Sequence, residues 1–449
     1  MNYEEIANEV IRIATEAGAE AEAYLTDGTQ TQITVSRNQV EKLSYAGSKG
    51  LGVRIIRDGR MGYAFTSDFS PDSVRATTEA ALTLVDAVDA DEYRQFPEPQ
   101  AIPDEDLAIF DPASTEITPE EKVNIALALE KSAYAADERV KVVLAANYVD
   151  GLGTVYLQNS RGFKGSYKQS FAAIYTMTMA MDGEERAMGM AMGTGRSARD
   201  LKPDEVGTEA GQKAARLLGG RPVPTQEASV VFSPFAAGGI MRAMSQALNG
   251  EAMQKGRSFL HGKMGQDVAS DNVSILDNGR LPGGFATRPF DDEGNPTSAT
   301  RLIDEGVLQA LLFDTYSAAR EGTSSTGNAN RGSHRSAPGL SASNFYLQPG
   351  HMSADEVIGS VEKGLYVVNV MNQAAINPIS GDYSVSAQGF WIEDGKQTFP
   401  VNNVTIAIPL DQMLNNISAI GDDLLFLPFG GALGTPTFRV DGVMIGGTS

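Results

Sequence analysis

The chain has 449 residues, no cysteine, and 57 acidic against 36 basic side chains, which gives a net charge of −21. This length predicts two or three domains, each large enough to bury its own core. The lack of cysteine excludes disulfides, thiolate nucleophiles, iron–sulfur clusters and cysteine-bound zinc in this chain. The acidic balance disfavours a nucleic-acid backbone or an anionic membrane as a partner.

The first residues include Glu4 and Glu5, whereas a signal peptide begins with a basic region. No stretch approaches the roughly 18 apolar residues that cross a bilayer. We therefore expect a soluble, cytoplasmic protein with no nucleic-acid or membrane partner.

The start of the chain is predicted to be an antiparallel sheet flanked by helices. Apolar residues at helical spacing predict a helix that ends at Gly18, and Ser70-Pro71 begins a second helix. Alternating apolar and polar residues predict strands. The strands are expected at 23–25, 32–36, 40–45, 51–56 and 61–65. Asp58-Gly59 supplies the positive φ values of a type I′ hairpin turn between the last two.

Residues 87–117 are rich in proline and acidic side chains, and this composition predicts a surface excursion. A capping box at Thr118–Glu121 then begins a helix that reaches about residue 136. After this helix, strands are predicted at 140–147, 154–159 and 167–179, and a further helix at 203–218.

The sharpest change in composition is Gly219–Pro224, and we predict the main domain boundary there, between 1–220 and 221–449. One helix is predicted from Ser233 to about Leu248. Beyond it, short apolar runs alternate with turn dipeptides, which is typical of a β-rich domain. The dipeptides are Asn278-Gly279, Glu305-Gly306, Asp394-Gly395 and Asp441-Gly442. The predicted fold class is α+β: an N-terminal helix-flanked antiparallel sheet domain, then a β-rich C-terminal domain resembling a barrel or sandwich.

The three histidines, His261, His334 and His351, lie too far apart in sequence for two to share one face of a helix. A compact two-histidine metal motif is therefore excluded. Each histidine is predicted to be a surface or structural residue.

Two segments are dense in polar groups. In the first, Leu281–Gly294, two interpretations stay open: its charged residues Arg288, Asp291, Asp292 and Glu293 clamp a peptide terminus, or they pair with one another. Because adjacent loop acids are rarely buried together, Asp291 and Asp292 are expected to be solvated. The residue types of the second segment, Asn377–Ser384, predict a turn first and a catalytic role only second.

Together these segments resemble the TldD/TldE family of metallopeptidases, also called the PmbA or "modulator of DNA gyrase" family. The resemblance extends over nearly the whole chain. The blocks that carry it are Arg37–Leu43, Gly50–Arg54, Gly62–Phe65, Pro282–Gly284, Phe290–Gly294, Gly306–Leu308, Asp314–Arg320, Thr326–Ala329, Asn344–Tyr346, Pro349-Gly350, Gly364–Val367, Asn377–Ser384 and Gly389–Glu393.

The resemblance implies a two-domain protein that acts as a dimer and digests unfolded peptides. In this family TldD carries zinc on a His-Glu-x-x-x-His helix, and TldE is its partner without those ligands. Here the motif falls on Met241–Gln246, where Met241, Arg242 and Gln246 replace the histidines and the glutamate. A thioether and an amide do not supply a zinc site.

We therefore expect a TldE/PmbA-like, non-catalytic subunit that holds no metal. Its expected partners are a TldD-type chain that carries the zinc, or a second copy, and unfolded peptide. Two alternatives are an autonomous, metal-independent peptide hydrolase or peptide-binding protein and, least favoured by the charge, a gyrase modulator that contacts DNA. The candidate peptide-binding residues are Arg288, Asp291, Glu293, Tyr316, Asn377, Gly381 and Asp382.

Overall fold

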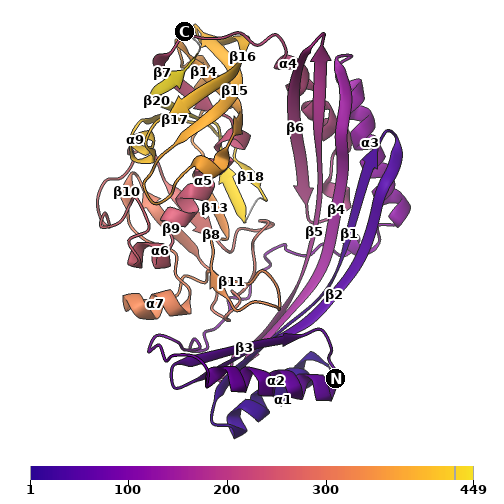
Figure 1. Cartoon of the computed structure of the whole chain (residues 1–449), viewed down its shortest axis with the longest axis vertical. Helices are drawn as coiled ribbons and strands as arrows, with labels where there is room; N and C mark the ends of the chain where they lie inside the picture. Colours follow the sequence, from indigo (N-terminus) through magenta and orange to yellow (C-terminus); the bar gives the residue numbers. More distant parts are fainter. Residues whose placement is uncertain (1, 429–430, 448–449) are drawn as a thin grey trace.

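The first half of the chain forms one six-stranded antiparallel sheet that spans much of the length of the molecule (Figure 1). The computed structural model describes residues 2–428 and 431–447. The strand order is β3-β2-β1-β4-β5-β6. The strands are β1 Glu20–Ser36, β2 Gln39–Arg57, β3 Arg60–Thr66, β4 Val140–Asn159, β5 Lys164–Asp182 and β6 Glu185–Gly195.

The hairpin turn predicted at Asp58-Gly59 is confirmed, since the two residues have φ values of 51° and 72°. The two strands predicted at 140–147 and 154–159 are wrong, because β4 continues through Gly151 and Gly153. Gly153 lies opposite Gly28 of β1, and a Cβ on Gly28 would lie 2.6 Å from the carbonyl oxygen of Leu152. The glycines therefore permit close strand contact and do not mark a turn.

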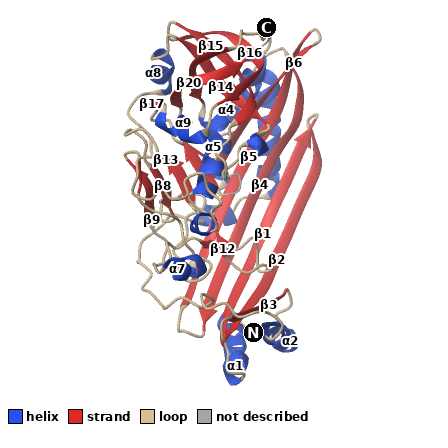
Figure 2. Ribbon diagram, turned by 60° about the vertical axis from the view of Figure 1, so that its left-hand side comes forward, coloured by secondary structure: helices blue, strands red, loops and turns tan. Residues whose placement is uncertain are grey.

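Four helices pack on this sheet. They are α1 Tyr3–Glu16, α2 Pro71–Val85, α3 Pro119–Ala135 and α4 Pro203–Arg216. The predicted apolar stripe of α1, including Ile6 and Val10, is buried against β1 and β2 together with α2. Helices α3 and α4 share a core with the upper parts of β1, β4 and β5. Figure 2 shows α1 and α2 at one end of the sheet.

Between α2 and α3, residues 87–117 form a long segment that we call the strap. It contains the 3₁₀ turn Pro112–Thr115, and its side chains Phe96 and Leu107 are buried. The Leu107 carbonyl accepts a hydrogen bond from Gly283 N, so the strap contacts the second half of the chain.

The second half contains two further six-stranded sheets. In the first, β16 also pairs with β20, so that β16, β15, β14, β7 and β20 close into a barrel with β17 beside β20. Its strands are β7 Gln226–Phe232, β14 Lys363–Met371, β15 Ser384–Glu393, β16 Lys396–Ala407, β17 Ile417–Ile420 and β20 Phe438–Gly446. The predicted α+β fold with a β-rich C-terminal part is confirmed.

The other sheet has the order β10-β9-β8-β13-β19-β18. Its strands are β8 Ile275–Asn278, β9 Ala299–Asp304, β10 Val307–Leu308, β13 Asn344–Leu347, β18 Leu425–Leu427 and β19 Ala432–Thr435, and a short hairpin joins β11 Ala329–Asn330 to β12 Gly339–Leu340. The helices of this half are α5 Pro234–Ala247, α6 Gly250–Gln254, α7 Thr315–Glu321, α8 Ala354–Gly359 and α9 Leu410–Asn415.

Two of the predicted turn dipeptides, Glu305-Gly306 and Asp394-Gly395, have positive φ at both residues and connect adjacent strands. Asp441-Gly442 was wrongly predicted to separate two strands, because it lies inside β20. There Gly442 has a φ of 70° and the register with β7 shifts, so this glycine forms a bulge.

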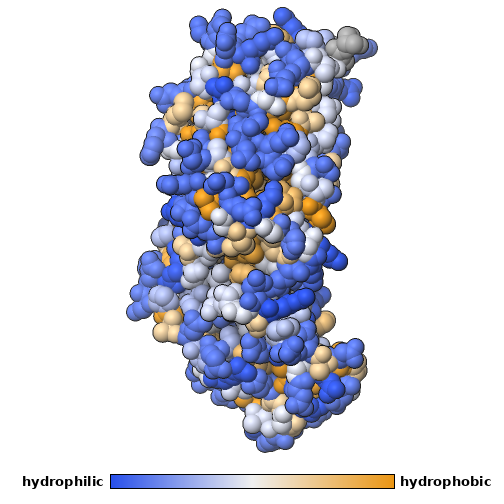
Figure 3. All heavy atoms as spheres, turned by 90° about the vertical axis from the view of Figure 1, so that its left-hand side faces the viewer, coloured by the Kyte–Doolittle hydropathy of each residue, from blue (hydrophilic) through white to orange (hydrophobic). Residues whose placement is uncertain are grey.

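The face of the molecule seen in Figure 3 is mainly hydrophilic, with apolar groups at mid-height. Within the described residues, each helix is too short or too polar to cross a membrane.

Candidate functional site

The motif helix of the second half is α5, which begins at the N-cap Ser233 with Pro234 in its first turn. Met241 points into the core and is 3% exposed, whereas Gln246 is exposed. The guanidinium of Arg242 lies outside the core and donates a hydrogen bond to the carbonyl oxygen of Gln373 over 3.0 Å. The three motif positions therefore do not converge on one point.

Two cavities adjoin this helix. The first, of 460 Å³, is lined by Phe235, Gly238, Arg242, Gln373, Ala374, Leu427 and Leu433. The second, of 360 Å³, shares Phe235 and lies between β5, β6 and β14. Five methionines line this second cavity: Met177, Met179, Met188, Met190 and Met371. Flexible, polarizable thioethers adapt to apolar partners of different shapes, so this cavity fits side chains of several sizes.

The residues at the motif do not fit zinc. Zinc requires three or four nitrogen, sulfur or oxygen ligands around one point, and here a buried thioether, a cation and an exposed amide occupy the positions. The charge of Arg242 opposes a divalent cation beside it. Over residues 2–428 and 431–447, the structure brings no three His, Asp or Glu side chains together in a way that could hold a metal ion.

The polar loop Leu281–Gly294 lies between the N-terminal sheet and the second half. Arg288 pairs with Asp292 over 3.0 Å and donates to the Ala329 carbonyl over 2.7 Å. The expectation that Asp291 and Asp292 are solvated is wrong, because they are 0% and 3% exposed. The loop folds back on β11 and on the sheet, which removes its acids from water.

Asp291 fixes the loop itself. Its Oδ1 accepts hydrogen bonds from the backbone N–H groups of Glu293 and Asn295, each over 2.9 Å, and its Oδ2 accepts from Ala329 N over 3.1 Å. Burial and the nearby charge of Glu293 raise the pKa of Asp291 to about 7. This carboxyl group therefore stabilises the backbone and does not face an open site.

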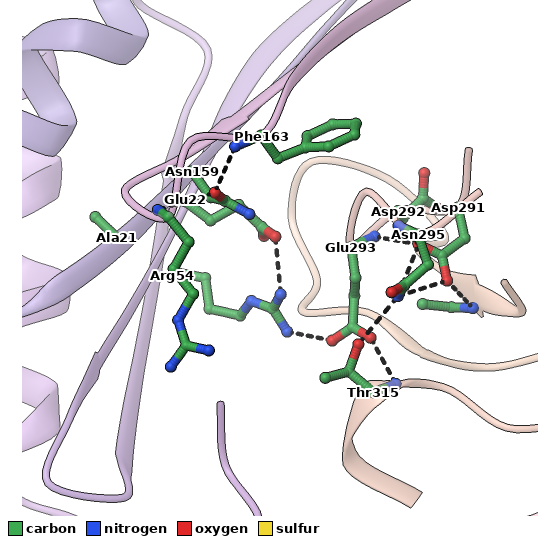
Figure 4. Close-up of polar contacts among 12 residues, drawn as sticks. Ala21, Glu22, Arg54, Asn159, Phe163, Asp291, Asp292, Glu293, Asn295 and Thr315 are labelled. Atoms are coloured by element: carbon green, nitrogen blue, oxygen red, sulfur yellow. Dashed lines mark hydrogen bonds and ion pairs between the residues drawn. The ribbon is translucent and has the colours of Figure 1, made fainter. Parts of the chain in front are cut away.

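Glu293 joins the loop to the sheet (Figure 4). Arg54 of β2 donates from Nη1 to Glu293 over 2.6 Å and from Nη2 to Glu22 of β1 over 2.8 Å. Glu293 Oε2 also accepts from the backbone N–H of Thr315 over 2.9 Å. Burial acts to raise the pKa of Glu293, but the charge of Arg54 and the hydrogen bonds outweigh it, and the pKa is lowered.

Glu22 has a second cationic partner, Arg331, whose guanidinium also lies over the ring of Tyr24, 4.6 Å from its centroid. We call Glu22, Arg54, Glu293 and Arg331 the interdomain charge cluster, and each side chain is 4% exposed or less. A polar cavity of 170 Å³ adjoins it, bounded by Tyr24, Tyr167, Arg288, Asp292 and Arg331 among others.

The sequence interpretation missed Glu22, Arg54 and Arg331. A signal was present for Arg54, because a charged residue inside the apolar run Leu51–Ile56 requires a buried partner. Within the loop Arg288 pairs with Asp292, as one of the two open interpretations proposed, whereas Glu293 pairs with Arg54 of the sheet, which neither interpretation proposed.

The remaining candidate residues are dispersed. Tyr316 on α7 donates from its hydroxyl to Asp91 of the strap over 2.8 Å, and Arg94 lies 4.2 Å from its ring centroid. Tyr316 therefore anchors the strap. Its neighbour in the chain, Thr315, contacts Glu293.

Asn377, Gly381 and Asp382 form a separate surface turn. The side-chain oxygen of Asn377 accepts from Ile379 N over 2.9 Å, Gly381 has a φ of 80°, and Ser380 Oγ donates to Asp382 over 2.5 Å. These local hydrogen bonds and the positive φ of Gly381 are typical of a turn. The hydrogen bonds of this turn are internal to it and do not join it to the polar loop Leu281–Gly294.

Comparison with known proteins gives three family matches along the chain. Residues 21–85 match PmbA/TldA metallopeptidase domain 1, residues 112–218 the central domain and residues 225–447 the C-terminal domain of the same family.

Relatives of similar length match over most of this chain. A metalloprotease PmbA from Escherichia coli O157:H7 is 28% identical, over 94% of this chain and 91% of the relative. A PmbA homologue from Haemophilus influenzae is 29% identical, over 92% of this chain and 90% of the relative.

Two crystal structures share the fold. A proposed modulator of a DNA gyrase from Thermotoga maritima has a TM-score of 0.91 and 25% identity, over 99% of this chain and 100% of the other. TldE from Thermococcus kodakarensis has a TM-score of 0.91 and 24% identity, over 98% of this chain and 100% of the other.

Proposed function

The chain belongs to the PmbA/TldD metallopeptidase family, and we propose that within it this chain is a TldE/PmbA-type subunit, which binds unfolded peptide beside a zinc-bearing chain. It acts in the cytoplasm and holds no zinc itself.

The observation that carries this proposal is Arg242 on α5. The zinc motif of the family would place a carboxylate there, and this chain places a cation that is hydrogen-bonded to the Gln373 carbonyl at the border of a 460 Å³ cavity. A guanidinium there cannot take a proton from water, but it can hold a carbonyl or carboxylate oxygen of a peptide.

The methionine-lined cavity supports a role in peptide binding. Met177, Met188 and Met371 are 37–40% exposed and meet where β6, an edge strand, lies opposite the end of β14. An extended peptide that lies along a strand edge is recognised through its main chain, while pockets accept alternate side chains. This mode suits unfolded substrates of varied sequence.

The test is metal analysis and peptide hydrolysis with the purified chain, alone and mixed with a TldD-type chain from the same genome. We expect the lone chain to be free of metal and inactive, and the mixture to contain zinc and to cleave an unfolded peptide until a chelator is added. Cleavage by the lone chain, or one bound metal per chain, would overturn the proposal. Salt-sensitive DNA binding by the lone chain would support the gyrase alternative instead.

A variant pair tests the peptide-binding part. In the mixture, Met188→Asp should raise KM several-fold with little change in kcat, because it charges the apolar cavity. Met264→Asp, at a methionine that is 49% exposed and does not line either cavity, is the matched control. Equal kinetics for the two variants would contradict peptide binding at the methionines.

A further inference from the structure

A pocket of 280 Å³ lies on the face of the N-terminal sheet that carries α3. The sheet forms one side of this pocket, the start of α3 a second, and the strap with its 3₁₀ turn a third. Figure 1 shows α3 on one side of the sheet and the second half of the chain on the other. The pocket shares no lining residue with the two cavities beside α5, so it is a separate site.

One part of the pocket wall is apolar. It is formed by Ile33 of β1, Leu43 and Tyr45 of β2, Ile117 of the strap and Pro119 of α3. Leu43 and Tyr45 are 53% and 68% exposed, so this part of the wall reaches the surface. Apolar side chains around an open pocket favour an apolar ligand, because binding removes both surfaces from water.

The inner part of the pocket contains an ion pair. Lys122 of α3 and Asp150 of β4 meet over 2.6 Å, and their side chains are 13% and 14% exposed. Lys122 Nζ also donates to Thr31 Oγ1 over 3.0 Å, and the Tyr148 hydroxyl donates to Asp150 Oδ2 over 2.7 Å. Burial and the hydrogen bond to Asp150 raise the pKa of Tyr148, so this hydroxyl keeps its proton.

This polar part has unused hydrogen-bonding capacity. An ammonium group carries three protons, and Asp150 and Thr31 take two of those of Lys122. The contacts of Asp150 with Lys122 and Tyr148 both use Oδ2, and Oδ1 accepts no hydrogen bond from residues 2–428 and 431–447. A ligand hydroxyl can therefore accept a proton from Lys122 and donate its own to Asp150.

The ion pair favours a neutral ligand. The charges of Lys122 and Asp150 compensate one another, so a carboxylate or an ammonium group would bring an unpaired charge into a largely buried site. Apolar residues of similar volume often stabilise a fold as well as a buried ion pair does. The packing of α3 on the sheet therefore does not require this pair, whereas recognition of a polar ligand group does.

We propose that this pocket binds a phenol, a neutral aromatic ring whose hydroxyl reaches Lys122 and Asp150. Tyr45 and Phe171 place aromatic rings in the wall, and contacts between aromatic rings add to the gain from apolar burial. An apolar cavity of about 150 Å³ holds benzene, so 280 Å³ accepts a substituted ring. A free phenolic compound and the tyrosine side chain of a peptide share this chemistry.

The ligand p-cresol, which is a tyrosine side chain without its backbone, tests the proposal on the lone chain. Titration calorimetry should show one site per chain. Toluene, the same ring without the hydroxyl, should bind about tenfold more weakly or worse, because it leaves the polar groups of the pocket unpaired. The charged 4-methylbenzoate should also bind about tenfold more weakly or worse.

A pair of leucine variants tests the position of the site. Leu43→Ala should raise the Kd of p-cresol several-fold, because it removes part of the apolar wall. Leu84→Ala is the matched control, since Leu84 is 45% exposed on α2 and does not line the pocket. Equal melting temperatures would show that both variants fold.

Lys122→Met tests the recognition of the hydroxyl. It keeps an unbranched side chain at this position but removes the ammonium group. The preference for p-cresol over toluene should therefore fall severalfold relative to the unmodified chain. An unchanged preference in this variant would overturn the assigned role of Lys122 and with it the proposed geometry.

A Kd for p-cresol above about 10 mM would overturn the proposal, as would equal binding of toluene or equal Kd values for the two leucine variants. Displacement of p-cresol by a blocked peptide with one tyrosine would assign the pocket to a peptide side chain, and lack of displacement would assign it to a free phenolic compound. These measurements need neither a TldD-type chain nor zinc nor hydrolysis, so failure here is distinct from failure of the proposed function.

Discussion

Arg54 and Glu293 are 239 residues apart in sequence, and their side chains meet over 2.6 Å between the N-terminal sheet and a loop of the second half. Both side chains are almost fully buried, so water cannot take the place of the missing partner if either residue is lost. This ion pair and its neighbours Glu22 and Arg331 connect the two halves of the chain.

Arg54→Met should lower the free energy of unfolding by about 3–5 kcal/mol, because it leaves Glu293 and Glu22 buried with less compensation. Chemical denaturation measures the change. Arg12→Met is the matched control, since Arg12 pairs with Glu9 and Glu16 on the surface and should cost less than about 1 kcal/mol. A loss below about 1 kcal/mol for Arg54→Met would show that the buried cluster does not hold the halves together.

Asp291 makes the stability depend on pH. Its pKa is about 7 in the folded chain, compared with roughly 3.9 in an unfolded one. A raised pKa means that the folded state binds the proton more tightly, so this group's contribution is complete below about pH 4 and is lost as pH rises through about 7. Asp291→Asn removes that dependence, although it also weakens the hydrogen bonds to the loop.

The free energies of unfolding of the unmodified chain and Asp291→Asn should therefore converge as pH rises. We expect the gap to narrow by about 2 kcal/mol between pH 5 and pH 8. Chemical denaturation at several pH values measures both chains. A gap that stays constant, or widens with pH, would mean that Asp291 is ionised throughout this range.

Tyr316→Phe should release the strap. The substitution removes the hydrogen bond to Asp91. A bond to a charged acceptor contributes about 1.5–3 kcal/mol, and the partly buried position of this one reduces the amount. We expect a trypsin or Glu-C cut within residues 87–117 to become several-fold faster. Tyr3→Phe removes the same kind of bond, from the start of α1 to Asp27 of β1, and should leave the strap's cleavage rate unchanged.

Gly207→Ala tests the contact between α3 and α4. Alanine favours a helix over glycine by about 1 kcal/mol. However, a Cβ at this position would lie 2.5 Å from the Leu129 carbonyl and closer still to the Ser132 hydroxyl. We therefore expect a net destabilisation of about 1–3 kcal/mol in thermal or chemical unfolding. Gly359→Ala in α8, where a Cβ meets open space, should be neutral or stabilising.

The sequence could predict elements whose pattern is local. The α1 stripe, the Asp58-Gly59 turn and the cap of α5 each depend on residues within a few positions of one another, and all three are present. The prediction of two strands in place of β4 was wrong, because Gly151 and Gly153 between them accommodate the approach of β1, a strand more than a hundred residues away in sequence.

The candidate site was only partly predictable for the same reason. The charged residues of Leu281–Gly294 stood out by their density, but their partners Arg54 and Arg331 lie at distant positions and follow no spacing rule. Asn377–Asp382 was equally dense in polar groups, yet those groups satisfy one another within the turn.

The position of Glu293 and Arg331 in the chain also determines when the interdomain charge cluster can be completed during synthesis. Arg54 and Glu22 leave the ribosome early, while their remaining partners follow roughly 240 to 310 residues later, a delay of roughly 12–60 s at about 5–20 residues per second. Until then the nascent sheet carries a half-matched set of charges on a surface that will become interior. The first half of this protein is thus synthesised before the second half supplies the counter-charges for the surface that the two halves bury together.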